Sequence, residues 1–277
     1  IIYQNATPVF IDSDYKTWNM DPKALKTAFE KYPNVKAVIV VHLYGLSADL
    51  DPIIDLCKKH NVPLIEDAAE SLGTKYKGKD TGTFGDYGIY SFNGNKIITT
   101  SGGGMLVSDN EEKIAKVRFW ATQSRDKARH YQHSELGYNY RMSNIVAGIG
   151  RGQLKVLDKR IAKKKYIFEF YKRELSQLDG IDFMPINDWN KPNYWLSVIT
   201  LDSNVRPLDI MIKLEEENVE SRPIWKPMHM QPFLEEYDYI GVNVSEKLFE
   251  NGVCLPSDTK MTDDDLNRTC EIIKGLW

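Results

Sequence analysis

The stretch VKAVIVVHLY, residues 35–44, decides the fold class because it is apolar and rich in β-branched side chains almost without alternation. Such a run is typical of a strand covered on both faces in a parallel sheet, where neither face meets water. It therefore predicts a central strand of a parallel sheet.

Helices are predicted on both sides of this strand. Asp21-Pro22 and Asp51-Pro52 each offer an N-cap residue followed by a proline at the first helical position. A second apolar strand, VPLIED at residues 62–67, follows the second helix. This spacing forms a βαβ unit, so we expect a doubly wound α/β domain with a mostly parallel sheet. Ligands of such sheets bind at the carboxyl ends of the strands, here residues 42–45 and 66–70.

The remaining chain is predicted to complete the sheet and then to enter a second unit. GDYGIYSF at residues 85–92 and MLVSD at residues 105–109 have the composition of strands. A long helical tract is expected from Ser143 to about Leu178, because its apolar residues recur at helical spacing. Short strands, a helix beginning at Pro207 and a final helix with a Thr262/Asp265 capping box follow. We predict a large domain over residues 1–155 and a smaller α+β domain over residues 156–277.

The composition argues against several classes of protein. The 277 residues include 36 Lys plus Arg and 39 Asp plus Glu, so a net charge of −3 argues against a nucleic-acid partner. Apolar runs such as AVIVV, residues 37–41, are far shorter than the roughly 20 residues that span a bilayer, so no membrane association is expected. Cys57, Cys254 and Cys270 are widely separated, which fits neither a disulfide framework nor a metal site. We expect no metal and a cytoplasmic location.

Lys96 is the sharpest chemical feature, because it follows a predicted buried strand on the glycine-containing turn of SFNGNK. A partly desolvated lysine forms Schiff bases with carbonyl compounds, above all pyridoxal phosphate. That cofactor needs a carboxylate for its pyridinium nitrogen and donors for its phosphate. Asp67, at the end of the preceding strand, and Ser91 suit these two tasks. The alternative is an ordinary solvated lysine.

Three ordered motifs carry a resemblance to a known family. They are IEDAAES at residues 65–71, GTFGDYGIYSFNGNKIITTSGGGM at 82–105 and LGYNYRMSNIVAGIGRGQL at 136–154. With them the chain resembles the DegT-type nucleotide-sugar aminotransferases, which depend on pyridoxal phosphate and have the aspartate aminotransferase (fold type I) architecture. Within this family, the motifs are most similar to those of aminotransferases that act at C4 of UDP-linked 4-keto-6-deoxy-N-acetylhexosamines. ESRPIWKPMHMQP, residues 220–232, supports that subgroup more weakly.

The resemblance implies roles for individual residues. Lys96 would form the Schiff base with the cofactor and later move the proton between cofactor and sugar. Asp67 would keep the pyridine nitrogen protonated, Ala69 would lie against the ring, and Ser91 would donate to the phosphate. Glu70 would lie near the ring hydroxyl and the sugar, although it could instead cap the following turn.

The third motif implies a homodimer with shared sites. Asn139 is similar to a family asparagine that reaches the phosphate of the neighbouring subunit's cofactor. We therefore expect a second copy of the chain as a partner, beside the nucleotide sugar and the amino-acid donor.

A loop near the C-terminus is a candidate for substrate binding. Its residues are Arg222, Trp225, Lys226 and His229. Basic groups suit a diphosphate, and an aromatic surface suits a sugar or a base. A proline-stiffened packing loop is an equal alternative. His42 could likewise reach the site from its strand end, but a hydrogen-bonded core histidine is at least as good an interpretation.

The resemblance implies amino transfer from L-glutamate to C4 of a UDP-4-keto-6-deoxy-N-acetylhexosamine, for bacterial polysaccharide biosynthesis. Alternatives are a C3 or a dTDP- or GDP-sugar aminotransferase, and a non-catalytic regulator that binds the cofactor. Relatives that dehydrate their substrate carry His in place of the lysine, so Lys96 favours transamination. A nicotinamide-dependent oxidoreductase is disfavoured because no GxGxxG opens a helix after a strand.

The start of the chain departs from the family pattern. Family members begin with a segment that includes a Gly-Thr-rich turn at a helix N-terminus and an aromatic residue that stacks on the ring. IIYQNATPVFIDSD, residues 1–14, contains neither. We expect that the N-terminal part of the cofactor domain lies outside this sequence, and that the 277 residues on their own bind the cofactor poorly or fold badly.

Overall fold

The computed structural model describes residues 1–277. Its first sheet has the strand order β2 (Val38–Val41), β3 (Leu64–Asp67), β6 (Tyr87–Ser91) and β7 (Gly104–Val107). The first three strands are parallel, and β7 pairs antiparallel with β6. The predicted mostly parallel α/β sheet is therefore confirmed.

The prediction that residues 35–44 form a central strand is wrong in this chain. β2 lies at the edge of the sheet, and its burial alternates. Val38 and Val40 are buried, whereas Ile39 and Val41 are about two-fifths exposed, at 39% and 42%. An apolar run shows that a strand can be covered on both faces, but packing decides which faces are covered.

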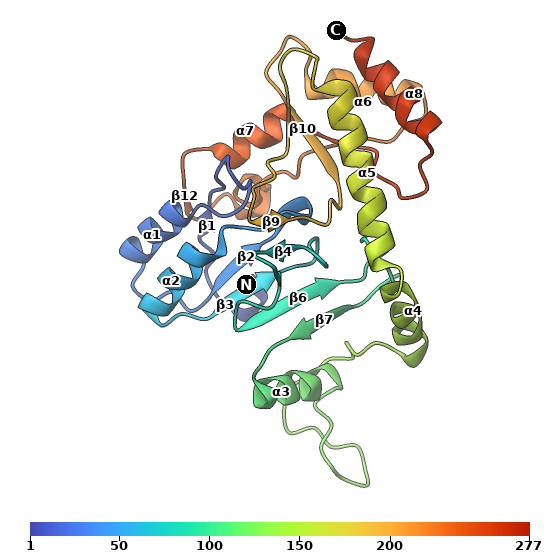
Figure 1. Ribbon diagram of the computed structural model, residues 1–277. Helices are drawn as coiled ribbons and strands as arrows, with labels where there is room; N and C mark the ends of the chain where they lie inside the picture. The colour runs from blue at the N-terminus through green and yellow to red at the C-terminus, as the bar shows by residue number, and fades with distance from the viewer.

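Two helices cover the buried face of the sheet, as Figure 1 shows. They are α1 (Pro22–Lys31) and α2 (Leu50–His60). The Asp21 side chain accepts from the Lys23 backbone N–H, so the predicted N-cap is confirmed. α2 begins two residues earlier than predicted, with Pro52 inside its first turn, where the missing N–H of proline costs no hydrogen bond. Both helices contribute to one apolar core with the sheet.

The C-terminal half builds a second, antiparallel sheet, which agrees with the α+β prediction. Its order is β11 (Arg222–Pro223), β13 (Gly252–Leu255), β10 (Ser197–Leu201) and β8 (Ile181–Phe183). A core of fourteen buried residues joins it to three helices. These are α5 (Leu157–Leu175), α6 (Pro207–Glu216) and α8 (Asp263–Lys274). α8 has the predicted Thr262/Asp265 capping box.

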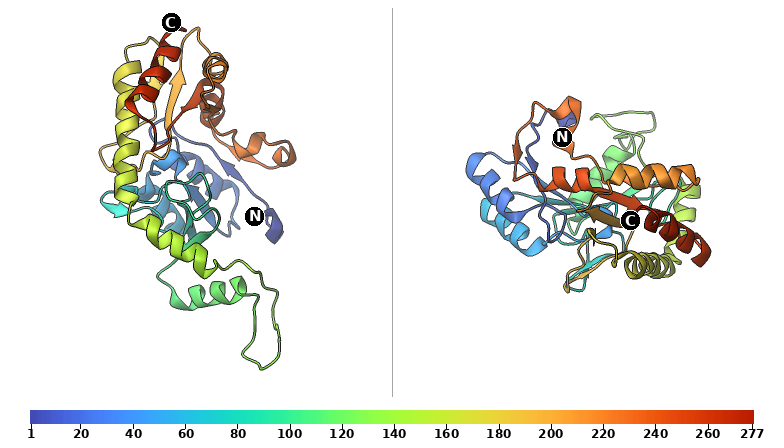
Figure 2. Two further views of the ribbon diagram at one scale, coloured as in Figure 1. Left: turned by 90° about the vertical axis from the view of Figure 1, so that its right-hand side faces the viewer. Right: turned by 90° about the horizontal axis from the view of Figure 1, so that it is seen from above.

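The predicted helix from Ser143 to Leu178 is two helices. α4 (Asn144–Leu154) ends before α5 begins, and Val156 between them has a non-helical backbone. Glycines in α4 lower its helix propensity, and only α5 packs into a buried core. α3 (Glu111–Ala121) and α4 flank a protruding segment, residues 122–143, which we call the arm (Figures 1 and 2).

The two halves are joined at several places. β1 (Phe10–Ile11) pairs with β12 (Tyr239–Ile240), and β4 (Lys75–Tyr76), which also pairs with β5 (Lys79–Asp80), pairs with β9 (Asn190–Lys191). A shared core includes Trp18 and Tyr44 from the first half and Trp195 from the second. The boundary at residues 155 and 156 stays a prediction. None of the helices combines the length and apolar character needed to cross a bilayer.

Asp12 makes one of these connections through its side chain. It is buried, at 1% exposure, and accepts from the backbone N–H groups of Val242, Val244 and Ser245 at 2.9 Å each. It thereby caps α7 (Val244–Asn251) from a distant part of the chain. Burial raises the pKa of Asp12, but hydrogen bonds from Tyr239 and Ser245 outweigh it and lower the pKa to about 2.

Asp12→Asn is therefore expected to lower the free energy of unfolding at pH 7 by about 2 kcal/mol. A depressed carboxyl pKa contributes stability above its ordinary value of 3.8, and this contribution is lost as the pH falls toward 2. The difference between the parent and the variant should then shrink below pH 4. Urea unfolding at several pH values measures it, with the exposed Asp55→Asn as control. An equal difference at pH 7 and pH 2.5 would contradict this assignment.

Candidate active site

Lys96 lies on the turn that follows β6, residues 93–96. Its backbone N–H donates to the Asn93 carbonyl, and Ile97 and Ile98 behind it are buried. Only 14% of the Lys96 side chain is exposed. Its Nζ lies 3.9 Å from Glu70 Oε1 and 4.3 Å from the ring centre of Trp195. These surroundings are those of an enclosed amine rather than of a freely solvated surface lysine.

The parallel strands bring Asp67 and Ser91 to the same edge of the sheet. Asp67 is the last residue of β3, opposite Val41 and Ile89, and Ser91 is the last residue of β6. Both side chains are half-buried. Asp67 Oδ1 accepts from the Ala69 backbone N–H at 3.0 Å, which orients the carboxylate and places Ala69 beside it. The edge therefore gathers a carboxylate, a hydroxyl and, one turn later, the Lys96 amine.

Glu70 contacts several parts of the candidate site. Its Oε2 accepts from the Tyr44 backbone N–H at 2.8 Å, and its Oε1 accepts from Trp225 Nε1 at 3.2 Å. Burial raises the pKa of Glu70 and outweighs the Tyr44 N–H, the Lys96 charge and the Trp225 N–H, which lower it. The Glu70 side chain therefore connects Lys96 to Trp225, and it makes these contacts instead of capping the turn that follows it.

His42 is a hydrogen-bonded core histidine. It is fully buried, its Nδ1 accepts from the Ala48 backbone N–H at 3.2 Å, and its Nε2 lies 3.0 Å from Glu66 Oε2. Because Nδ1 accepts, Nε2 carries the proton and donates to Glu66. Glu66 also accepts from three backbone N–H groups of the loop before β6. The pair supports the sheet beneath the site.

The candidate substrate loop divides into two parts. Trp225 reaches Glu70, and its ring centre lies 6.3 Å from that of Trp195. Lys226 is exposed, as is Arg222, which pairs with Glu220. His229 instead lies 3.0 Å from Glu246 and stacks on Tyr239 at 3.9 Å. The packing interpretation therefore describes His229 better than it describes Trp225.

Asn139 lies on the arm, away from any contact with Lys96 within this chain. It is exposed and forms a backbone bridge with Thr122 at the base of the arm. Its role on a neighbouring subunit's cofactor stays a prediction.

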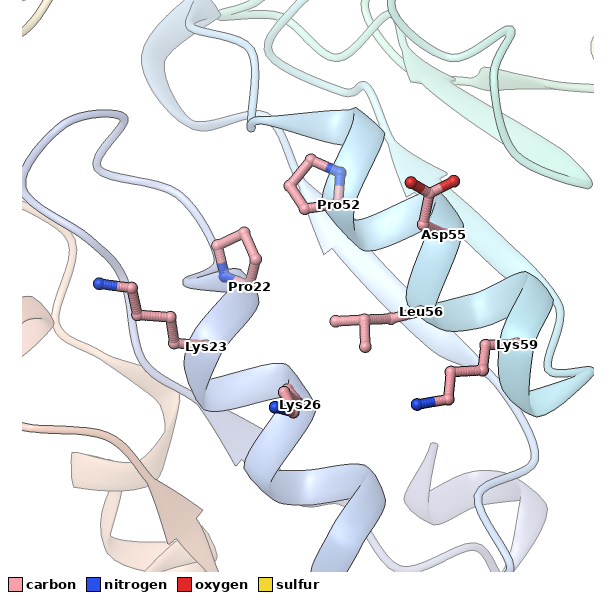
Figure 3. A pocket seen from close by; sticks show the side chains of 7 residues that line it. All are labelled: Pro22, Lys23, Lys26, Pro52, Asp55, Leu56 and Lys59. Carbon is pink, nitrogen blue, oxygen red and sulfur yellow. The ribbon is translucent and has the colours of Figure 1, made fainter.

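A hollow of about 360 Å³ lies between the N-terminal half of α1 and the length of α2 from Pro52 to Lys59 (Figure 3). Pro22, Lys23, Lys26, Pro52, Asp55, Leu56 and Lys59 line it. None of the predicted site residues is among them, so this hollow is separate from the lysine site.

Sequence reasoning gave no individual role to Tyr44, Asn193 or Trp195, although Tyr44 lies within residues 42–45, a strand end expected to bind ligands. Tyr44 is fully buried with a left-handed backbone, φ 56°, and its hydroxyl accepts from the Trp225 backbone N–H at 2.8 Å. Asn193 and Trp195 lie in the NYW segment, residues 193–195, just before β10. No motif marked them, because Trp195 binds Asn95, Asn193 binds Glu70 and Tyr44 binds Trp225 across long stretches of chain.

The donor set fits pyridoxal phosphate. An enclosed amine can bind the aldehyde, a carboxylate at a strand end can pair with the pyridinium nitrogen, and a serine hydroxyl beside the turn can donate to the phosphate. This combination at the carboxyl ends of parallel strands defines the class of fold type I pyridoxal-phosphate enzymes. The chain belongs to the DegT/DnrJ/EryC1/StrS aminotransferase family, whose profile matches residues 1–274.

Individual relatives agree with this assignment. The chain is 54% identical to "Putative pyridoxal phosphate-dependent aminotransferase EpsN" of Bacillus subtilis, covering 100% of this chain and 74% of the relative. It is 37% identical to GDP-perosamine synthase of Escherichia coli O157:H7, covering 100% of this chain and 75% of the relative. The solved structure of the aminotransferase TlmJ from Streptoalloteichus hindustanus superposes with a TM-score of 0.90 at 28% identity, covering 99% and 74%. The resemblance to the family and the predicted fold type I architecture are confirmed.

The raised pKa of Glu70 gives a testable consequence for stability. A carboxyl whose pKa rises on folding destabilises the fold once it ionises, because the charged form is disfavoured in the native state. Glu70→Gln removes this effect. The free energy of unfolding of the variant, relative to the parent, should therefore increase as the pH rises above 4.5. Chemical denaturation between pH 4 and pH 8 measures this trend, with the exposed Glu30→Gln as control. If the difference in the free energy of unfolding between variant and parent did not change with pH, folding would not disfavour the ionised form of Glu70.

Proposed function

We propose that the protein transfers an amino group from L-glutamate to C4 of a UDP-linked 4-keto-6-deoxy-N-acetylhexosamine. The family and its relatives make it a pyridoxal-phosphate-dependent sugar aminotransferase of nucleotide-sugar and polysaccharide biosynthesis. The single observation that carries the assignment of the site is the Lys96 amine, enclosed beside Glu70 at the strand ends that carry Asp67 and Ser91.

Pyridoxal phosphate, when bound, supplies an aldehyde for the amine and a ring that accepts electrons. Lys96 Nζ would bind that aldehyde and then move the proton between the cofactor's methylene carbon and C4 of the sugar. Asp67 would keep the pyridine nitrogen protonated, and Ser91 would donate to the phosphate. Ala69 offers a small side chain beside Asp67, which suits contact with a flat ring. Glu70 would orient the ring hydroxyl and the sugar.

The loop after β11 would recognise the nucleotide sugar. Trp225 is fixed at the site by Glu70 and by the Tyr44 hydroxyl. Arg222 and Lys226, on either side of it, are exposed cations that suit a diphosphate, while His229 would contribute through the packing of the loop. The identity of the nucleotide and sugar rests on the motif resemblance.

A homodimer with shared sites is part of this proposal. The arm protrudes from the rest of the chain, and Tyr131, Leu136 and Tyr140 on it are at least three-quarters exposed, at 75%, 80% and 77%. Ile145 on α4 is exposed as well, at 78%. Several large apolar side chains exposed on one protruding segment favour an interface with another copy, which would bring Asn139 to a second site. The three free, buried cysteines suit a reducing compartment, and we place the reaction in the cytoplasm.

A GDP-linked keto sugar is the second candidate substrate. A relative over the whole chain is a GDP-perosamine synthase at 37% identity, which favours it. A panel of UDP-, GDP- and dTDP-linked 4-keto-6-deoxy sugars with glutamate and pyridoxal phosphate separates the candidates. We expect mass spectrometry to find 2-oxoglutarate and, from the UDP-N-acetylhexosamine, a sugar with one amine in place of the ketone. Turnover of the GDP sugar alone would overturn the assigned nucleotide.

Lys96→Ala tests the catalytic lysine. We expect turnover to fall by about 10³-fold or more, because both the covalent attachment and the proton transfer are lost. The exposed Lys79→Ala is the control and should keep the parent rate. Undiminished biological activity of Lys96→Ala would instead support a non-catalytic regulator that binds the cofactor.

A further inference from the structure

We propose that Trp195 is a positioning residue for Lys96, an inference that rests on the proposed function. Its ring faces the Lys96 amine, and its indole N–H holds the Lys96 turn. Trp195 belongs to the second half of the chain, 100 residues from the carbonyl that it binds. The residue that would act on the substrate is therefore oriented by a side chain from the other half of the molecule.

Hydrogen bonds hold both the backbone and the indole ring of Trp195. Its Nε1–H donates to the Asn95 carbonyl at 2.9 Å, directly before Lys96. Its backbone N–H donates to Asn193 Oδ1 at 2.9 Å, and its carbonyl accepts from the buried Lys164 Nζ at 2.8 Å. The residue is only 3% exposed. Two bonds hold the backbone of this residue and the third holds its indole within a buried site, so few alternative rotamers are open and the ring is a rigid surface for the amine.

Asn193 connects the same segment to Glu70. Its Nδ2 donates to the carbonyls of Glu70 and Leu72 at 2.9 and 3.0 Å. A Cβ on Gly45, whose φ is +88°, would lie 1.9 Å from Asn193 Oδ1, so only glycine leaves room for this contact. Residues 193–195 thus contact both the Glu70 turn and the Lys96 turn. One short segment sets the separation of the carboxylate and the amine.

The physical effect of the ring follows from its charge distribution. The negative face of an indole attracts an ammonium group, and the Lys96 Nζ lies 4.3 Å from the ring centre. Glu70 Oε1 attracts the same group from 3.9 Å. The two attractions limit where Nζ can lie. Proton transfer requires such a fixed position, since a displacement of about 1 Å can cost on the order of 10²-fold in rate.

A purely structural role is the competing explanation, because Trp195 also belongs to the core shared by the two halves. Two substitutions separate the roles. Trp195→Phe keeps an aromatic face but loses the bond to Asn95, and Trp195→Leu loses both. Trp277→Leu is the matched control, because Trp277 Nε1 donates to the Asp179 carbonyl at 2.8 Å, a bond of the same kind.

The first readout uses the protein without cofactor and does not depend on its reaction. Limiting acetic anhydride is added, and mass spectrometry gives the ratio of Lys96 to Lys23 acetylation. We expect the ratio to rise severalfold in Trp195→Leu, because the shielding ring is gone, and to rise much less in Trp195→Phe. Trp277→Leu should match the parent. A folded Trp195→Leu with the parent ratio, or equal ratios for the Phe and Leu variants, would overturn the proposal.

The second readout is kinetic. We expect Trp195→Leu to lower kcat by about 10- to 100-fold with little change in KM, and Trp195→Phe to restore much of kcat. A rise in KM alone would contradict a role in positioning the lysine. Should Trp195→Leu fail to fold, Trp195→Met replaces it with the same expected results. Absence of turnover in the full-length parent, tested with saturating pyridoxal phosphate, would count against the proposed function, while the acetylation ratios would still decide the role of Trp195.

Discussion

Glu66 is a carboxylate without exposure to water, and the first sheet depends on its hydrogen bonds. It accepts from His42 Nε2 and from the backbone N–H groups of Gly82, Phe84 and Gly85. Burial raises the pKa of Glu66, but these bonds outweigh it and lower the pKa. A buried carboxylate without such partners would be strongly destabilising. These bonds therefore fix the loop that leads into β6. The position of β6 in turn places Ser91 at its end and Lys96 on the turn after it.

The candidate site is assembled by the meeting of the two halves of the chain. The first half supplies Lys96 and Glu70 on turns at the carboxyl ends of parallel strands, as expected for this kind of sheet. The second half supplies Trp225 and Trp195, whose indole N–H groups bind Glu70 and the Lys96 turn. The candidate substrate loop is thus connected to Lys96 by direct contacts, because Trp225 donates to Glu70 Oε1, which lies 3.9 Å from Lys96 Nζ.

Local structure was largely predictable from sequence. The caps at Asp21 and Thr262 formed as expected, because capping involves residues within a few positions of each other. The prediction of one long helix was wrong at Val156, where the chain breaks into two helices. The helical spacing of apolar residues continues across this break, so the spacing did not reveal it. The apolar run at β2 indicated two covered faces, but Ile39 and Val41 are partly exposed. Burial depends on what packs against a residue, and no local pattern contains that information.

By itself the sequence determined the order of the motifs, the strands that carry them and the candidate amine at Lys96 with Asp67 and Ser91 nearby. These features lie at the ends of two neighbouring parallel strands, β3 and β6, whose short connection leaves few possible arrangements. Only the tertiary structure decided which side chains enclose the amine. Trp225 binds Glu70 across 155 residues of chain and Trp195 binds Asn95 across 100. Contacts of that separation arise from the packing of whole sheets and helices, which single residues and their neighbours do not specify.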